Sequence, residues 1–309
     1  MLSKVRIGTR TSTLALWQAN WVKNQLEELW QGLEVELVPV KTSGDKIQEI
    51  SLARIGGKGL FVKEIEEALV VGRVDLAVHS VKDLPADLPE GLMLSAVPAR
   101  EDPRDVLVSL HAATINTLPA GARVGTSSLR RQALLLHLRP DVRVELLRGN
   151  VDTRLKKLEA GVVDATILAA AGLKRLGLMS EQGHVLDETL FLPAIGQGAL
   201  GIETRRGDET RELVMPLHDQ RTGWAIEAER VFLKAVGGSC KTPLAGRAKV
   251  SASGLELSAL IATPDGKTVL RGTETGRVEE TVQVGNTLAD RLLSRGGREI
   301  LGGLENHGW

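Results

Sequence analysis

The chain has 309 residues, of which 42% are hydrophobic and 25% are charged, a composition typical of a globular protein of about two or three domains. Its 39 lysines and arginines balance 39 aspartates and glutamates, which argues against a protein held on nucleic acid by overall positive charge. The single cysteine excludes an intramolecular disulfide and any metal site built from several cysteines.

No hydrophobic segment of the sequence has the length of a membrane span. Polar residues interrupt the apolar stretches of the first 21 residues, so no signal peptide is expected. The longest apolar runs, such as Ala165–Leu173, are well short of the roughly 18–20 residues that cross a bilayer. The sequence therefore predicts a soluble cytoplasmic protein with no membrane segment.

The first part of the chain alternates short β-branched runs with helical patterns. The expected strands and helices are, in order, Val5–Gly8, Thr13–Trp30, Val35–Val40, Glu64–Val71 and Val74–His79. Strands that alternate with helices indicate βαβ units and a mainly parallel sheet.

Three short motifs then recur in the same order. The pairs are Arg6–Thr9 with Arg123–Thr126, Val35–Leu37 with Val144–Leu146, and Gly72–Asp75 with Gly161–Asp164. The separation between the two copies of a motif is 109 residues for the second pair and 89 for the third. The first copy therefore has an insertion between these two motifs, where the glycine-rich stretch Thr42–Gly59 lies. This pattern predicts two similar α/β lobes, the first with an extra loop that could act as a lid. Alternatively, such fragments are shared by any two βαβ lobes.

The pattern changes near Met215. A helix at Trp224–Ala235 is followed by three expected strands and a last helix, at Ala248–Ser251, Leu255–Ala262, Thr268–Gly272 and Thr281–Ser294. Successive strands followed by a helix predict a smaller α+β domain.

Basic residues concentrate in the second lobe. Between Ala122 and Leu176 there are eleven basic and five acidic residues. Four of the arginines lie where strands end and helices begin: Arg130, Arg131, Arg148 and Arg154. Arginine is unfavourable at a helix N-terminus unless an anion is held there, and open α/β sheets bind ligands at strand carboxyl ends. We therefore expect an anion site, with a solvated helix face as the alternative.

Two further residues are candidates for chemistry. Asp83 follows the apolar strand that ends near His79, where it is either a turn former or a catalytic carboxylate. Cys240 lies in a Gly-Gly-Ser-Cys-Lys-Thr-Pro loop, which is typical either of a thiol presented near positive charge or of a small buried side chain.

Several of these segments together resemble the porphobilinogen deaminase family. The matching motifs are Gly8-Thr9-Arg10-x-Ser12, Gly56-Gly57-Lys58-Gly59, His79-Ser80-Val81-Lys82-Asp83, Gly125-Thr126-Ser127-Ser128-Leu129-Arg130-Arg131, Leu147-Arg148-Gly149-Asn150, Pro193-Ala194-Ile195-Gly196-Gln197-Gly198 and Cys240-x-Thr242-Pro243. The resemblance runs from residue 4 to about residue 300, and the C-terminal strands match least. Arg54 stands where the family often has lysine.

The resemblance implies two doubly wound α/β lobes like those of periplasmic binding proteins, plus a smaller α+β C-terminal domain. The limits it predicts are residues 1–99 with 200–217 for the first lobe, 100–199 for the second, and 218–309 for the domain that carries Cys240. We also expect a monomer.

The implied reaction joins four porphobilinogen molecules head to tail into a linear tetrapyrrole, with loss of ammonia at each step. Growth starts from a dipyrromethane cofactor bound covalently at Cys240, and Asp83 stabilises the positive charge left when ammonia departs. Carried over by matching position, the catalytic residues are Asp83 and Lys82. The predicted cofactor ligands are Cys240, Asp83, Ser80, Lys82, Thr126, Ser128, Arg130, Arg131 and Arg148. The predicted substrate ligands are Arg10, Ser12, Arg148, Arg154, Arg175 and Gln197, with Arg54 and Lys58 on the lid and no metal.

Two other functions fit parts of the pattern. A non-catalytic, two-lobed anion-binding or sensor protein explains the arginines but gives Cys240 and Asp83 no role. A cysteine-nucleophile transferase acting on a small acid would form a labile acyl intermediate, whereas a thioether survives mild base.

Overall fold

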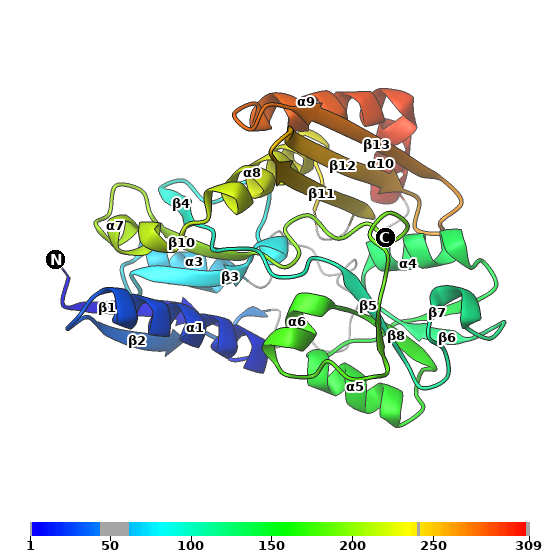
Figure 1. Ribbon diagram of the computed structural model, residues 1–309, viewed down its shortest axis with the longest axis horizontal. Helices are drawn as coiled ribbons and strands as arrows, with labels where there is room; N and C mark the ends of the chain where they lie inside the picture. Colours follow the sequence, from blue (N-terminus) through cyan, green and yellow to red (C-terminus); the bar gives the residue numbers. More distant parts are fainter. Residues whose placement is uncertain (1, 44–61, 240–241, 307–309) are drawn as a thin grey trace.

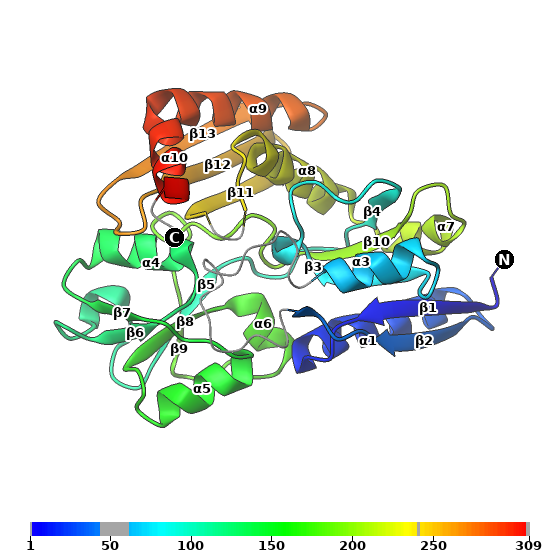
Figure 2. The same cartoon turned by 180° about the vertical axis from the view of Figure 1, so that it is seen from behind.

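The computed structural model describes residues 2–43, 62–239 and 242–306. They form three sheets with flanking helices (Figures 1 and 2). No helix within these ranges is both long and apolar enough to cross a membrane. The predicted lid residues Arg54 and Lys58, and the predicted cofactor cysteine Cys240, lie outside the described residues.

Lobe 1 is built on a five-stranded sheet of order β2-β1-β3-β10-β4. Its strands and helices are β1 (Lys4–Thr9), α1 (Thr13–Leu29), β2 (Glu34–Pro39), α3 (Lys63–Val70), β3 (Leu76–Ser80), β4 (Leu92–Ala96), β10 (Leu200–Arg205) and α7 (Thr210–Val214). Ser12 caps α1 by accepting a hydrogen bond from the backbone N–H of Ala15 at 3.3 Å. Ala19, Val22 and Leu26 form the buried face of α1, at the spacing that places them on one side of a helix.

Lobe 2 is built on a second five-stranded sheet, of order β7-β6-β8-β5-β9. Its strands and helices are β5 (Asp105–Ser109), β6 (Arg123–Gly125), α4 (Leu129–Leu138), β7 (Arg143–Glu145), α5 (Val151–Glu159), β8 (Ala165–Ala169), α6 (Ala170–Arg175) and β9 (Gly183–Val185). In each lobe four of the five strands run in the same direction, and one strand, β10 in lobe 1 and β5 in lobe 2, runs antiparallel to its two neighbours. The expectation of two α/β lobes is confirmed.

The C-terminal domain has a three-stranded antiparallel sheet of order β11-β12-β13. Its strands and helices are α8 (Gln220–Ala235), β11 (Leu244–Ser251), β12 (Gly254–Ala262), β13 (Val269–Gly276), α9 (Thr281–Leu292) and α10 (Arg298–Asn306). Helices α8 and α9 pack together and onto this sheet, where the buried core includes Phe232, Leu257 and Leu288. The predicted α+β domain is therefore confirmed.

The repeated sequence motifs occupy equivalent places in the two lobes. In lobe 1, Nη2 of Arg6 donates to Gly72 O at 2.9 Å and to Asp75 Oδ1 at 2.8 Å. In lobe 2, Nη2 of Arg123 donates to Gly161 O at 3.0 Å and to Asp164 Oδ1 at 2.7 Å. Each bond joins the first strand of the repeat to the turn before the third, so the motifs mark one supersecondary unit used twice.

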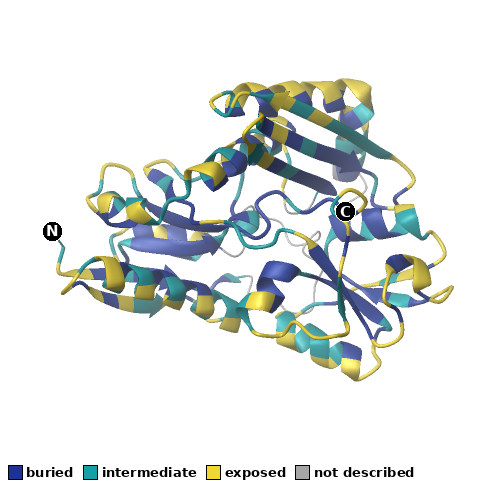
Figure 3. Ribbon diagram, viewed as in Figure 1, coloured by how far each residue is buried: buried dark blue, intermediate teal, exposed yellow. Residues whose placement is uncertain are grey.

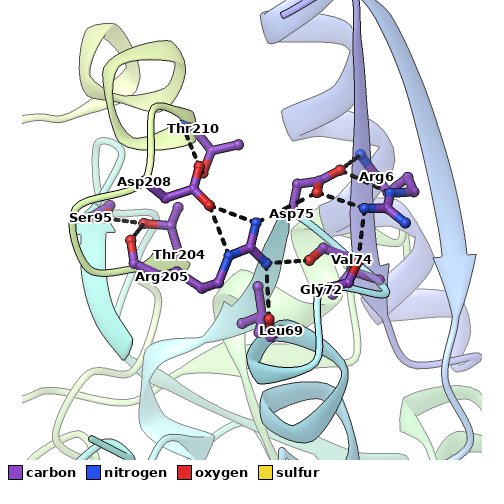
Figure 4. Close-up of polar contacts among 10 residues, drawn as sticks. All are labelled: Arg6, Leu69, Gly72, Val74, Asp75, Ser95, Thr204, Arg205, Asp208 and Thr210. Carbon is purple, nitrogen blue, oxygen red and sulfur yellow. Dashed lines mark hydrogen bonds and ion pairs between the residues drawn. The ribbon is translucent and has the colours of Figure 1, made fainter. Parts of the chain in front are cut away.

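The strand that completes lobe 1 arrives late in the chain. β10 lies between β3 and β4, although lobe 2 separates it from both in the sequence. Its last residue, Arg205, is anchored to carbonyl oxygens of Leu69 and Val74 at 2.9 and 2.8 Å (Figure 4). The chain thus crosses between the lobes twice. The place of β10 in the first sheet supports our proposal that lobe 1 consists of residues 1–99 with 200–217.

Figure 3 shows that the central strands of the sheets are buried, whereas the outer faces of the flanking helices are exposed. The carboxyl ends of β3 and β8 face the middle of the molecule, where α1 of lobe 1 meets α6 of lobe 2 (Figure 1). This junction is where the predicted site residues gather.

Candidate active site

A cavity of about 180 Å³ opens between the two lobes. Its walls come from the start of α1, the end of β3, the start of α5 and the turn from β8 into α6. Eight of the residues predicted from the sequence line it: Arg10, Ser12, Ser80, Lys82, Asp83, Arg131, Arg154 and Arg175. The expectation that strand and helix ends form one site agrees with this arrangement.

Asp83 and Lys82 follow directly from β3. The chain leaves the strand at Ser80 and makes a short 3₁₀ turn over Val81–Asp83, in which Val81 is buried and the two charged residues are half-buried. Asp83 lines the main cavity and also a smaller one of about 50 Å³, where it faces Arg10, Gln18 and His79. Asp83 therefore borders both cavities, which adjoin each other and share several lining residues.

Lys82 has a lowered pKa, so it loses its proton more readily than a lysine in water. Burial lowers the pKa of Lys82 to about 8, and Arg131 and Arg130 act in the same direction, whereas Asp83 and Asp105 oppose it. A carboxylate bound beside Lys82 would favour its charged form and would be held by it in return.

Arg154 and Arg175 bring positive charge to the cavity without a partner carboxylate. Nε of Arg154 donates to Gly149 O at 2.8 Å, and Nη2 of Arg175 donates to Gly198 O at 2.8 Å. Neither forms an ion pair within the described part of the chain. Burial, the largest effect, lowers the pKa of each to about 10. These are the properties of a site that receives anions.

Trp17, which the sequence analysis did not single out, contacts this site from lobe 1. Its ring lies beneath the Arg175 guanidinium, with Cζ 6.0 Å from the ring centroid. Gln18, on the next position of α1, donates to Ser80 Oγ at 2.9 Å. Leu14 and Gln18 are four residues apart on α1, so they lie on the same face of the helix, and both line the cavity. This spacing is a signal that could have identified Gln18 as a site residue.

Arg130 and Arg131 have a resident counter-charge. Nη1 of Arg130 lies 2.7 Å from Asp105 Oδ2, and Nη2 of Arg131 lies 2.8 Å from Oδ1 of the same residue. Asp105 is fully buried; burial acts to raise its pKa, but the two arginines prevail and bring the pKa to about 2. Arg131 reaches the cavity wall, whereas Arg130 does not line it and donates instead to Leu192 O at 2.8 Å.

Asp105 itself was missed as a site residue. It begins an apolar run, Asp105–Ser109, and a charged residue at the start of a buried strand is a signal that a partner of opposite charge must lie nearby. The two adjacent arginines that pair with it are only 25 and 26 positions later.

Four other predicted residues lie around the cavity without lining it: Thr126, Ser128, Arg148 and Gln197. Ser128 caps α4, and Thr126 Oγ1 accepts from the Ser128 N–H at 3.1 Å. Nε2 of Gln197 donates to Pro103 O at 2.6 Å and to Asp105 Oδ1 at 3.2 Å. In this structure Thr126 and Ser128 shape the start of α4, and Gln197 joins the arginine cluster through Asp105.

The donor set suits a ligand with several carboxylates. Lys82, Arg154 and Arg175 bring positive charge that can bind anionic groups, and the carboxylates of Asp83 and Asp152 line the same cavity. Among the described residues, no group of three or more histidine, cysteine, aspartate or glutamate side chains is arranged to hold a metal ion.

Comparison with known proteins gives matches over nearly the whole chain. The family model described as "Porphobilinogen deaminase, dipyromethane cofactor binding domain" matches residues 5–212, and the one described as "Porphobilinogen deaminase, C-terminal domain" matches residues 224–294.

Curated relatives carry the same description. The chain is 54% identical over 304 residues to the porphobilinogen deaminase of Syntrophotalea carbinolica, covering 98% of this chain and 96% of that protein. It is 52% identical over 299 residues to that of Pelobacter propionicus, with 96% of each covered, and 51% identical over 301 residues to that of Geobacter sulfurreducens, with 97% of this chain and 94% of that protein covered.

Solved structures give weaker similarity. The periplasmic aliphatic sulphonate binding protein of Escherichia coli is 17% identical with a TM-score of 0.42, covering 76% of this chain and 71% of that one. An ancestral cationic amino acid solute binding protein is also 17% identical, with a TM-score of 0.45, covering 72% of this chain and 90% of that one.

Proposed function

Because the chain belongs to the porphobilinogen deaminase family, we propose that the cavity between the lobes is where it joins porphobilinogen units. The enzyme is a transferase of tetrapyrrole synthesis that builds a linear tetrapyrrole from four porphobilinogen molecules. The observation that carries the placement is one cavity in which Asp83 meets Lys82, Arg154 and Arg175. A non-catalytic sensor is not favoured, since relatives matched over the whole chain are named as the enzyme.

Asp83 is proposed as the catalytic carboxylate. When ammonia leaves, the C–N bond of the substrate breaks and positive charge develops on the pyrrole and its methylene carbon. The terminal pyrrole of the growing chain then forms a C–C bond to this methylene carbon through its free ring carbon, and that ring carbon loses its proton. A fixed carboxylate at this point stabilises the developing charge and can take up the proton. The half-buried position of Asp83, on the border of two adjoining cavities, suits both tasks.

The arginines are proposed to hold the carboxylates of the pyrroles. Arg10, Ser12, Arg154 and Arg175 form the substrate set, and Arg148 and Gln197 are retained in it as sequence predictions. Each charge-assisted hydrogen bond contributes about 1.5–3 kcal/mol, so several together would retain a growing acidic chain. Arg154 and Arg175 support this role most directly, because neither forms an ion pair with a described residue and each donates only to a backbone carbonyl there.

The dipyrromethane cofactor supplies the primer to which substrate units are added. The N-terminal part of the chain matches the cofactor-binding domain of the family. We propose that Ser80, Lys82, Asp83 and Arg131 hold its acidic side groups from the cavity wall. Thr126, Ser128, Arg130 and Arg148 stay sequence predictions for this role, and covalent attachment at Cys240 is likewise proposed.

Intact mass measurement tests the attachment. The purified enzyme should exceed its sequence mass by two linked pyrrole units, and Cys240→Ser should lack this excess. Ser239→Ala, the adjacent substitution, is the control and should retain it. Wild-type protein that stays unmodified even after incubation with porphobilinogen would contradict the proposal.

We also propose that the enzyme acts as a monomer in the cytoplasm on a small-molecule substrate, without nucleic acid or membrane partners. The balanced charge supports the absence of a nucleic-acid partner. Light scattering coupled to gel filtration would test it, and a mass of two or more chains would overturn the monomer.

A further inference from the structure

A second and larger cavity, of about 700 Å³, lies between lobe 1 and the C-terminal domain. One wall is the segment 86–94, which leads into β4, and the other is a face of α8 (Figures 1 and 2). Among the described residues it shares no lining residue with the catalytic cavity. Its size is within the range of about 300–1,000 Å³ that is usual for small-molecule sites.

Arg230 is the half-buried charge of this cavity. Its Nη2 donates to Ala86 O at 3.0 Å, but its Nη1 is fully buried and meets no hydrogen-bond acceptor within the described ranges. Burial lowers the pKa of Arg230, although Glu203 and Asp87 oppose this shift from a distance. Nη1 is closed off from the cavity, but the Arg230 side chain lines it, so its positive charge would stabilise an anion bound there.

His218 adds a second donor. Its Nδ1 accepts from the backbone N–H of Val97 at 3.1 Å, which assigns the proton of the neutral ring to Nε2. Burial lowers the pKa of His218, so the neutral form prevails at pH 7. Nε2 of His218 lies against Gly223, and a Cβ added at this glycine would be only 2.6 Å from it. The imidazole ring can therefore approach α8 closely because residue 223 has no side chain.

The acidic residues of the cavity lie at its exposed rim. Asp87 pairs with Lys234 at 2.6 Å, and Glu227 accepts a hydrogen bond from Thr281 at 2.8 Å. Glu90 is exposed. The inner part of the cavity therefore offers donors, and these select a ligand that ends in an acceptor, above all a carboxylate.

The remaining walls are apolar and partly aromatic. Leu88, Pro89 and Met93 line the lobe 1 side, and Trp224 and Val231 line the α8 side. Trp224 is half-buried, so its ring offers a flat surface to a ligand.

We propose that this cavity is a binding site for a planar, largely apolar carboxylate, with its anionic end on Arg230 and its ring against Trp224. Such a ligand would contact lobe 1 and α8 at once. Since binding to the folded state alone raises its stability, the ligand would raise the unfolding temperature. The inference is independent of the proposed function, because it uses none of the catalytic residues.

Binding of 2-naphthoate, measured by ligand-observed NMR and calorimetry on the holoenzyme, tests this site. We expect Arg230→Met to weaken binding by about tenfold or more, the effect of losing a charge-assisted hydrogen bond. Arg206→Met, which removes an exposed arginine lining the same cavity, is the matched control and should leave binding unchanged. The neutral analogue 2-naphthamide should bind much more weakly than the acid.

A second variant protects the test against misfolding of Arg230→Met. Met93→Trp fills the cavity from the opposite wall while leaving Arg230 in place, and it should also abolish binding. Porphobilinogen at saturating concentration should not displace the probe. Three results would each overturn the inference: displacement of the probe by porphobilinogen, unchanged binding to a folded Arg230→Met protein, or equal binding of the amide. None of these results would bear on the proposed catalytic function.

Discussion

Asp83 shows how a single side chain acquires a role from its position at a strand end. β3 is buried up to His79, and the short turn that follows brings Lys82 and Asp83 to the cavity while Val81 fills the core. The sequence could predict this exit from the sheet because the apolar run stops there. It could not distinguish a turn former from a catalytic group, since that depends on Arg154 and Arg175 from the other lobe.

Asp83→Ala should keep the bound cofactor but lose most turnover, about 100-fold or more, as expected when a group that stabilises developing charge is removed. Intact mass and the rate of porphobilinogen consumption measure the two effects separately. Asp152→Ala is the control, because Asp152 lines the same cavity but is exposed. Near-normal turnover in Asp83→Ala would remove this residue from the mechanism.

Glu66 gives the stability of lobe 1 a pH dependence. It is buried beside Glu203 and His79, and its Oε1 has no hydrogen-bond partner among the described residues. Burial first, and then the charge of Glu203, raise the pKa of Glu66 to about 7, while His79 opposes them. The folded state therefore keeps this proton up to about pH 7, whereas the unfolded chain loses it near pH 4.5.

Stability should consequently fall as the pH rises from 4.5 through 7. For Glu66 alone, the loss between pH 5.5 and 8.5 is about 2 kcal/mol. Glu66→Gln should remove this slope, and urea unfolding at the two pH values measures it. Glu67→Gln, at the exposed neighbouring position, should keep the slope of the wild type. The same slope in Glu66→Gln as in the wild type would show that Glu66 does not titrate in this range.

At the scale of elements, the parallel part of each sheet could be predicted and the antiparallel part could not. The helix predicted at Thr13–Trp30 is observed at Thr13–Leu29, and the strand predicted at Val5–Gly8 at Lys4–Thr9. The expected mainly parallel sheet is confirmed, but each lobe also has one strand that runs against the other four, β10 in lobe 1 and β5 in lobe 2, and this strand was not foreseen. β10 shows the reason: its pairing with β3 joins residues more than 100 positions apart, which local periodicity does not encode.

The site shows the same division. The anion site predicted at helix and strand ends stays a prediction at Arg154, and it is compatible with the structure because the partner of Arg154 is a carbonyl oxygen of its own turn. The same reasoning did not foresee that Arg130 and Arg131 already share a carboxylate, since Asp105 is on a different strand. Local sequence thus indicates where charge concentrates, whereas the fold determines which charges are still available to a ligand.

Asp105→Asn should destabilise the protein by about 3 kcal/mol, because it leaves two buried arginines without their counter-charge at the start of β5. Urea unfolding measures the loss. Asp164→Asn, which breaks the more exposed pair with Arg123 in the same lobe, is the comparison and should cost far less. Similar losses in the two variants would mean that burial of the Asp105 cluster adds nothing.

At the scale of the whole molecule, the two chain segments that connect the lobes both bind the same carboxylate of the C-terminal domain. Glu229, on α8, is fully buried. Its Oε1 lies 2.6 Å from Nη1 of Arg100, on the first crossing, and its Oε2 accepts from the backbone N–H of Gly196 at 2.7 Å, on the second. It also accepts from Ala248 of β11 at 2.8 Å. One side chain thereby connects three parts of the protein that are distant in the sequence.

Glu229→Gln should lower the free energy of unfolding by about 3 kcal/mol or more, because Arg100 would stay buried without its counter-charge. Urea unfolding followed by tryptophan fluorescence measures this loss, and Glu227→Gln, at an exposed position of the same helix, is the control. Replacing both partners, as Arg100→Met with Glu229→Met, removes the unpaired charge and should recover part of the stability. If Glu229→Gln unfolded at the same urea concentration as Glu227→Gln, the two connecting segments would be held by packing alone. Ile226, which packs with Val81 and Val97 of lobe 1, would then be the next residue to test.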